Sequence, residues 1–185
     1  MKINFSFIIL VLFSLYIGYF NKLFLFLICL FIHEIGHIIT VILFKVKIKK
    51  FSLSIFGGVL ELDEKDYNNL ICFKKIIIYI SGIIMNIIFC LLFEETEFGN
   101  YHLILFFFNS LPIYPLDGFN IFKIMFNNTV INNINICFII ILLIISIYNN
   151  SFGLIIISVI LIIQNIKYYK SKDRIFLLKL INNMI

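Results

Sequence analysis

Two histidines and a glutamate stand close together in an apolar stretch, CLFIHEIGHIITV, at residues 29–41. The i, i+4 spacing of His33 and His37 places both imidazoles on one face of a helix, where they can reach one tetrahedral metal ion. Glu34 lies beside them, in position to accept a proton from a water molecule. This H-E-x-x-H arrangement predicts a zinc site that assists hydrolysis.

The composition of the chain places these residues in a membrane. Of the 185 residues, 62% are hydrophobic, and the mean hydropathy of +1.09 far exceeds that of a water-soluble domain. An ionisable residue within hydrocarbon is costly and therefore indicates a functional site. For a single histidine the alternative is a core side chain bonded to a serine or a carbonyl. The three residues together favour the metal site.

A zinc ion that activates water needs three protein ligands, so a third ligand is expected from another part of the chain. Asp117 is the other acidic residue that we place within the membrane. It lies in NSLPIYPLDGF, where Pro112 and Pro115 remove backbone donors and Gly118 permits an unusual turn, so we expect the helix to break there. The alternative is a tight turn at the membrane surface with a solvated Asp117. Beside the H-E-x-x-H motif, we favour the ligand.

Six apolar runs predict an all-α polytopic membrane protein with about six transmembrane helices, because about 20 residues are needed to cross the hydrocarbon. The first run is expected to be a retained anchor, since no small-residue cleavage site follows it. The runs lie at residues 4–20, 23–44, 76–93, 101–113, 131–148 and 152–166.

A small membrane-associated β-hairpin is predicted between the second and third runs. The stretch FSLSIFGGVLELD alternates apolar and polar residues on both sides of Gly57 and Gly58, which is typical of two strands joined by a glycine turn. The edge of such a hairpin could hold an extended substrate by strand addition. Alternatively, the hairpin is structural and covers the mouth of the site.

The distribution of basic residues predicts the topology. With both termini in the cytoplasm, every Lys and Arg except Lys22 lies on the cytoplasmic side. The net charge of +5 then reflects topology, and we expect no nucleic-acid partner. The tail at residues 167–185 is predicted to be either a basic amphipathic helix on the inner leaflet or a disordered end. The four cysteines, which lack ligand spacing, are expected to be buried free thiols: Cys29, Cys72, Cys90 and Cys137.

The HEIGH motif, followed by NSLPIYPLDG, resembles the site-2 protease family of intramembrane zinc metalloproteases over about residues 23–123. The resemblance implies one zinc ion per chain, with His33, His37 and Asp117 as ligands and Glu34 as the general base. It also implies that Asn109 contacts the substrate or the transition state.

Two positions depart from the pattern of that family. The stretch SGIIMN at residues 81–86 is similar to the family's GPxxN element, with Gly82 and Asn86 retained and Ile83 where proline is usual. The resemblance therefore implies an oxyanion or substrate contact for Asn86. Phe119 follows the LDG turn where many members have glycine, and we expect it to alter the shape of the loop without touching a ligand.

The compact form most resembles the stage IV sporulation branch, whose members release a pro-sigma factor from its membrane-associated pro-sequence in the mother cell. We expect one transmembrane metalloprotease domain over residues 1–166, a short basic cytoplasmic tail at 167–185, and no PDZ or CBS domain. The expected partners are a membrane protein or membrane-associated peptide as substrate, membrane inhibitor proteins and the lipid bilayer. The expected location is a bacterial cell membrane, such as that between mother cell and forespore.

Two other classes of function are compatible with an apolar chain of this kind. A catalytically inactive membrane protein could use the same fold to bind a client, but it would have no need of Glu34 within a hydrocarbon span. A transporter could use Glu34 and Asp117 as a proton or metal relay, but the two halves of the chain show no repeat. We therefore expect an enzyme, a zinc metalloendopeptidase.

Overall fold

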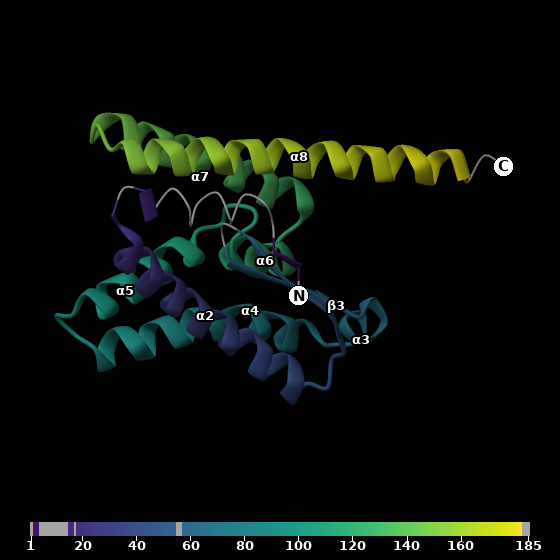
Figure 1. Cartoon of the computed structure of the whole chain (residues 1–185). Helices are drawn as coiled ribbons and strands as arrows, with labels where there is room; N and C mark the ends of the chain where they lie inside the picture. Colours follow the sequence, from purple (N-terminus) through teal and green to yellow (C-terminus); the bar gives the residue numbers. More distant parts are fainter. Residues whose placement is uncertain (1, 4–14, 17, 55–56, 183–185) are drawn as a thin grey trace. The chain divides into compact units, whose positions relative to one another are not determined.

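The computed structural model describes residues 2–3, 15–16, 18–54 and 57–182 (Figure 1). The chain forms two compact units, Met1–Leu111 and Pro112–Ile185. The single functional domain predicted over residues 1–166 stays a prediction.

Three helices of the first unit pack together: α2 (Phe20–Leu43), α4 (Cys72–Leu92) and α5 (Glu97–Ser110) (Figure 1). Two clusters of buried apolar side chains hold α2 in place, one near the middle of the helix and one near its C-terminal end. The clusters are Cys29, Leu30 and Leu105, and Val41, Val46 and Ile78. The H-E-x-x-H motif lies on α2 between them, so its side chains are positioned from both sides.

Small residues allow α2 and α4 to approach each other closely. A Cβ atom added at Gly36 of α2 would lie 2.7 Å from the carbonyl oxygen of Ser81 on α4, closer than real side chains come. One turn further along, the hydroxyl oxygens of Thr40 and Ser81 are 3.1 Å apart. Close approach through small residues is typical of helices that pack within a membrane.

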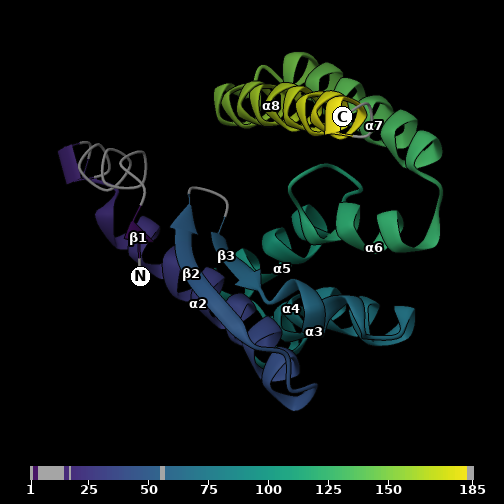
Figure 2. The ribbon, with the colours of Figure 1, turned by 90° about the vertical axis from the view of Figure 1, so that its right-hand side faces the viewer.

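The predicted β-hairpin is present, but its turn is not where we expected it. Strands β2 (Ile48–Ser54) and β3 (Gly57–Leu62) pair antiparallel, and β1 (Lys2–Ile3) pairs parallel to β2 (Figure 2). Gly57 and Gly58 pair with Ser54 and Leu53 within the ladder, so the two glycines begin β3. The connection is made by residues 55–56, which lie outside the described residues.

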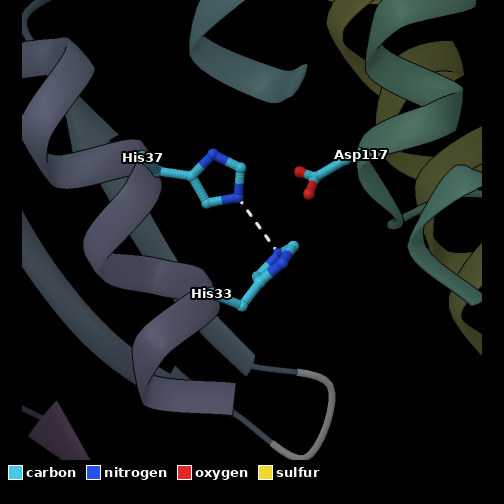
Figure 3. Close-up of side chains that lie close together, drawn as sticks. All are labelled: His33, His37 and Asp117. Carbon is cyan, nitrogen blue, oxygen red and sulfur yellow. Dashed lines mark hydrogen bonds between the residues drawn. The ribbon is translucent and has the colours of Figure 1, made fainter. Parts of the chain in front are cut away.

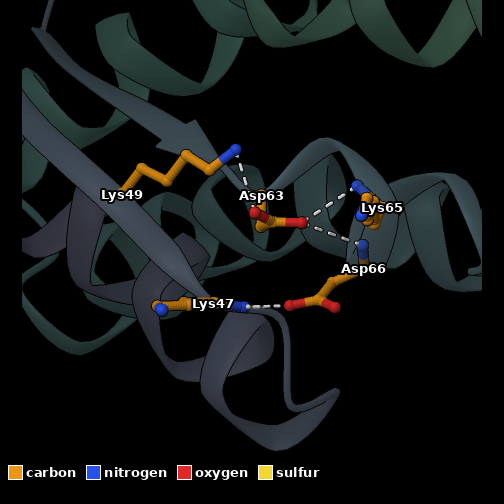
Figure 4. Close-up of polar contacts among 5 residues, drawn as sticks. All are labelled: Lys47, Lys49, Asp63, Lys65 and Asp66. Carbon is orange, nitrogen blue, oxygen red and sulfur yellow. Dashed lines mark hydrogen bonds and ion pairs between the residues drawn. The ribbon is translucent and has the colours of Figure 1, made fainter.

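Asp63 fastens the end of the hairpin to the short helix α3 (Glu64–Asn68) (Figure 4). Its carboxylate accepts hydrogen bonds from the backbone amides of Lys65 and Asp66, as an N-cap residue does, and lies 2.9 Å from the ammonium group of Lys49. The hydrogen bond from Lys49, followed by that from the Asp66 amide, lowers the pKa of Asp63. In turn, Asp66 accepts a hydrogen bond from the backbone amide of Lys47.

Four of the described helices are long and apolar enough to cross a membrane: α2, α4, α7 (Asn128–Tyr148) and α8 (Phe152–Asn182), the last over Phe152–Ser171. Large apolar side chains such as Ile42, Ile84 and Ile144 are exposed on their surfaces, as expected for helices that face lipid. These four helices correspond to four of the six predicted runs.

The prediction of six spans is not confirmed. The run at residues 4–20 lies mostly outside the described residues, and the run at 101–113 corresponds to α5, which has 14 residues. At 1.5 Å per residue such a helix is about 21 Å long, shorter than about 30 Å of hydrocarbon. Helix α5 ends at Ser110, two residues before Pro112, because the irregular segment that contains this proline cannot continue the helix.

Two further predictions concern the tail and the cysteines. Helix α8 continues to Asn182, so the tail is helical as far as residue 182, and its position on the inner leaflet stays a prediction. The expectation of buried thiols is right for Cys29 and wrong for Cys72 and Cys137, which are exposed on the protein surface. Apolar runs in a membrane protein have a lipid-facing side, so position within a run does not determine burial in the protein.

Replacing Asp63 with Ala should loosen α3 and the end of the hairpin, because the Lys65 and Asp66 amides and Lys49 would lose their acceptor. Hydrogen exchange of residues 64–68 should become faster, whereas Asp63→Asn, which still offers a capping oxygen, should retain most of the protection. Because the pKa of Asp63 is lowered, its stabilising charge is present above the usual value of 3.8 and is lost as the pH falls through the lowered pKa. Equal exchange in Asp63→Ala and wild type would contradict this role.

Candidate metal centre

His33 and His37 project from the same face of α2, and their Nε2 atoms are 3.2 Å apart (Figure 3). Both side chains are buried, with exposed fractions of 2% and 6%. Two imidazole nitrogens bound to one tetrahedral zinc ion at about 2.0–2.1 Å would be about 3.3 Å apart. The helix therefore already holds the pair at a separation that suits a shared ion.

The second ring nitrogen of His37 shows which of its nitrogens carries the proton. Its Nδ1 atom lies 2.7 Å from the backbone carbonyl oxygen of Ile78 on α4. A carbonyl only accepts hydrogen bonds, so Nδ1 donates and the lone pair of Nε2 points toward His33. A backbone carbonyl on the far nitrogen is the usual way in which a metal-binding histidine is oriented.

The second ring nitrogen of His33 contacts an asparagine in place of a carbonyl. Its Nδ1 atom lies 2.9 Å from Nδ2 of Asn86 on α4, and Oδ1 of Asn86 lies 3.1 Å from Nδ1 of His102 on α5. Asn86 and His102 are fully buried. The oxyanion or substrate contact expected of Asn86 stays a prediction, and the observed partners of its amide are two histidines.

His102 was missed by the sequence analysis, although one signal was available. It stands in the apolar run YHLILFFF, and a polar residue in such a run is a functional hypothesis by the same rule that identified Glu34. Its pairing with Asn86, 16 residues earlier in the chain, depends on how α4 and α5 pack.

Gly82 of α4 leaves the space that the two imidazoles occupy. A Cβ atom at this position would lie 2.4 Å from His37 Nε2 and 2.7 Å from His33 Cε1. Any larger residue at position 82 would therefore push the rings away from α4. The paired nitrogens, the orientation of the His37 ring and this glycine together fit a metal ion.

The remaining predicted residues of the first unit are Glu34 and Asn109. Glu34 is 5% exposed and follows His33 directly on α2, while Asn109 is 5% exposed near the end of α5. Among the described residues, Nδ2 of Asn109 is buried without a hydrogen-bond partner. A buried donor without a hydrogen-bond partner costs about 1–3 kcal/mol. Such a donor is expected where a side chain is kept to bind a ligand.

Asp117, the predicted third ligand, belongs to the second unit and is the first residue of α6 (Asp117–Met125) (Figure 3). The predicted break is confirmed, because α5 ends at Ser110 and the next helix begins at Asp117. The expectation of an unusual turn at Gly118 is wrong. Gly118 lies in the first turn of α6, where the helix N-terminus favours the negative charge of Asp117.

Two buried asparagines of the second unit hold the segment that precedes Asp117. Oδ1 of Asn135 on α7 accepts a hydrogen bond from the Tyr114 amide at 3.2 Å, and Nδ2 of Asn165 on α8 donates to the Tyr114 carbonyl at 2.9 Å. Nδ2 of Asn135 also donates to Asn165 Oδ1 and to the Tyr169 hydroxyl, at 2.6 and 3.0 Å. Both backbone groups of Tyr114 are thus fixed to the two long helices.

Aromatic rings reinforce this anchor, and the ring of Phe119 is one of them. The Phe119 side chain is 1% exposed and packs edge-on against Tyr114 and Tyr168, with ring centroids 5.5 and 5.8 Å apart. Tyr114 and Tyr168 stack with centroids 4.3 Å apart. Phe119 therefore holds the segment in place through packing.

These features define a class of protein. Four apolar helices and a buried H-E-x-x-H motif on one of them indicate an integral membrane protein with the donor set of a zinc hydrolase. Residues 6–94 match the family model of peptidase family M50, the family of the site-2 proteases. The matched residues include the H-E-x-x-H motif and Asn86, whereas Asn109 and Asp117 lie beyond them. No curated protein matches the chain.

Replacing Gly82 with Ala should weaken zinc binding by at least about tenfold, because the new methyl group would displace both imidazoles. The measurement is a competition titration of the detergent-purified protein against a zinc chelator. Gly153→Ala on α8 is the matched control, since a Cβ atom at Gly153 meets nothing within 4 Å. Unchanged affinity in a folded Gly82→Ala protein would contradict the proposed fit.

Replacing Asn135 with Leu should destabilise the second unit by about 1–3 kcal/mol, because the Tyr114 amide would lose its buried acceptor. Denaturant unfolding in detergent measures this change, and hydrogen exchange should rise at residues 113–117. Asn133→Leu, at an exposed position on the same helix, should change both measurements much less. Equal behaviour of the two variants would show that Asn135 does not anchor the segment.

Proposed function

We propose that the chain is an intramembrane zinc endopeptidase of family M50, which cleaves a membrane-spanning or membrane-associated protein. One observation carries this proposal: the Nε2 atoms of His33 and His37 converge to 3.2 Å within an H-E-x-x-H motif on an apolar helix. The match of residues 6–94, which include this motif, to family M50 agrees with it.

One zinc ion per chain would be held by His33, His37 and Asp117. When bound, zinc lowers the pKa of water to about 7 and polarises a carbonyl group. The support for Asp117 as third ligand is chemical. It is a carboxylate at the start of α6, after a helix break and beside a segment fixed by Asn135 and Asn165, and such anchoring reduces the cost of ordering a ligand.

The chain's own groups supply the proton transfers of peptide hydrolysis. Glu34 accepts a proton from the attacking water and returns it to the leaving amine, as a general base and then a general acid. Asn109 is the better of the two predicted oxyanion donors, because its buried Nδ2 has no partner among the described residues, whereas the amide of Asn86 contacts His33 and His102. A donor of this kind contributes about 3–4 kcal/mol to transition-state stabilisation.

The hairpin supplies a means of holding an extended substrate. The strand order is β1-β2-β3, so β3 is an edge strand among the described residues. The edge of β2 already carries the short parallel strand Lys2–Ile3, and pairing of an extended peptide along β3 would use the same chemistry. The resemblance to the sporulation branch makes a membrane-associated pro-sigma factor the first substrate to test, with both termini of the enzyme in the cytoplasm.

Zinc content tests the centre without knowledge of the substrate. Elemental analysis of the detergent-purified protein should give about one zinc per chain for wild type and for Glu34→Gln, and little for His33→Ala and Asp117→Ala. Cleavage of a membrane substrate by Glu34→Gln should fall about 10²–10⁴-fold, because the general base is lost.

Glu94→Gln is the matched control for the change of charge, because Glu94 is an exposed glutamate just after α4. It should retain both zinc and activity. Wild type that remains free of zinc after reconstitution would overturn the protease proposal, and normal cleavage by Glu34→Gln would overturn the role of Glu34.

A further inference from the structure

Two lysines in the first turn of α4 are held in place by aromatic rings. The ammonium group of Lys74 lies 5.5 Å from the ring centroid of Phe44, the residue that follows α2. The ammonium group of Lys75 lies 5.1 Å from the ring centroid of Tyr67 and donates to the Asn68 carbonyl at 3.3 Å. Both lysines therefore have defined positions where the end of α2 meets the start of α4.

The charges of these two lysines are not balanced within the part of the chain that the structure describes. The two carboxylates at the end of the hairpin have cations of their own, since Asp63 pairs with Lys49 at 2.9 Å and Glu61 pairs with Lys50 at 2.7 Å. The first turn of α4 contains no acidic residue. An ammonium group has three donors, so both lysines of α4 have donors left for an anion from outside the chain.

Large apolar side chains next to these lysines are exposed on the protein surface. Ile71 and Phe73, at the start of α4, are 62% and 67% exposed, and Leu43, the last residue of α2, is 68% exposed. Helices α2 and α4 are both long and apolar enough to cross a membrane. Ammonium groups beside apolar side chains at the end of such helices match a phospholipid, which has an anionic phosphate and apolar acyl chains. A free anion would leave the apolar side chains uncovered.

The opposite end of the same helices carries the opposite charge. Glu94, Glu95 and Glu97 are exposed where α4 connects to α5. The Sγ atom of Cys29 on α2 lies 3.8 Å from a backbone carbonyl in the first turn of α5, so this connection is near the start of α2, where Lys22 lies. The three glutamates would repel an anionic lipid. The charges therefore favour such a lipid at the other end, beside the lysines of α4.

We propose that the surface formed by Leu43, Ile71, Phe73, Lys74 and Lys75, called the headgroup surface here, binds an anionic phospholipid. The two ammonium groups contact the phosphate, and the three apolar side chains contact the acyl chains. A lipid bound in this way holds the adjoining ends of α2 and α4 at the level of the headgroups. The headgroup surface is separate from the candidate metal centre, so this inference does not depend on the proposed protease activity.

Native mass spectrometry of the full-length protein in detergent tests the proposal, with phosphatidylglycerol and phosphatidylcholine of the same acyl chains titrated separately. Wild type should bind phosphatidylglycerol at least about tenfold more tightly than phosphatidylcholine. One lysine near an anionic lipid contributes a factor of about five, so Lys74→Gln and Lys75→Gln should each weaken binding of phosphatidylglycerol about fivefold, and the double variant about tenfold or more. The double variant Lys74→Arg/Lys75→Arg, which keeps both charges, should retain most of the affinity.

Lys22→Gln is the matched control, because the ammonium group of Lys22 also lies over a ring, 5.8 Å from the centroid of Tyr19, at the other end of α2. It should leave the binding of phosphatidylglycerol unchanged. Glycerol 3-phosphate, which has a phosphate but no acyl chains, should not displace the lipid at equal concentration.

Four results would overturn the proposal. Equal binding of the two lipids by wild type would show that there is no preference for an anionic headgroup. Unchanged affinity in the double glutamine variant, or an equal loss in Lys22→Gln, would show that the lipid does not bind at the headgroup surface. Displacement by an equal concentration of glycerol 3-phosphate would show a site for a free anion in place of a lipid.

Discussion

Polar groups on apolar helices have to find their hydrogen-bond partners within the protein, because hydrocarbon offers none. The first unit meets this constraint with a chain that links α5, α4 and α2 through His102, Asn86, His33 and His37. The second unit meets it with Asn135 and Asn165 around the backbone of Tyr114. Asparagine is the connector in both, because its amide carries a donor and an acceptor on one short side chain.

Helix packing and the candidate metal centre depend on the same glycine. Without a side chain at Gly82, the imidazoles of His33 and His37 fit against α4, and His37 can reach the Ile78 carbonyl at 2.7 Å. A larger residue would separate the helices and break that hydrogen bond together with the convergence of the two Nε2 atoms. The geometry that suits a metal ion is therefore a property of the α2–α4 interface as a whole.

Local spacing allowed part of this arrangement to be predicted. The i, i+4 spacing places His33 and His37 on one face of a helix independently of the tertiary structure. Two prolines predict the break before Asp117. The contacts of Asn86 with His33, 53 residues earlier in the chain, and with His102 depend on the rotation of α4 and α5, which apolar periodicity does not specify. The hairpin shows the same limit. Alternation identified its strands, but the ladder register put Gly57 and Gly58 in β3, because glycine is tolerated within a ladder as well as in a turn.

The shortness of α5 bears on the proposed chemistry. A helix of 14 residues spans about 21 Å, less than the hydrocarbon thickness, so if α5 enters the membrane, irregular backbone follows it there after Ser110. Such backbone persists there only where protein buries it or where it lines a water-filled cavity. Pro112, Ile113 and Leu116 are buried, and Tyr114 is held at both backbone groups. The proposed hydrolysis of a peptide bond would need water beside these apolar helices, and a helix that ends early, with the buried donor of Asn109 in its last turn, would suit that reaction better than a complete span.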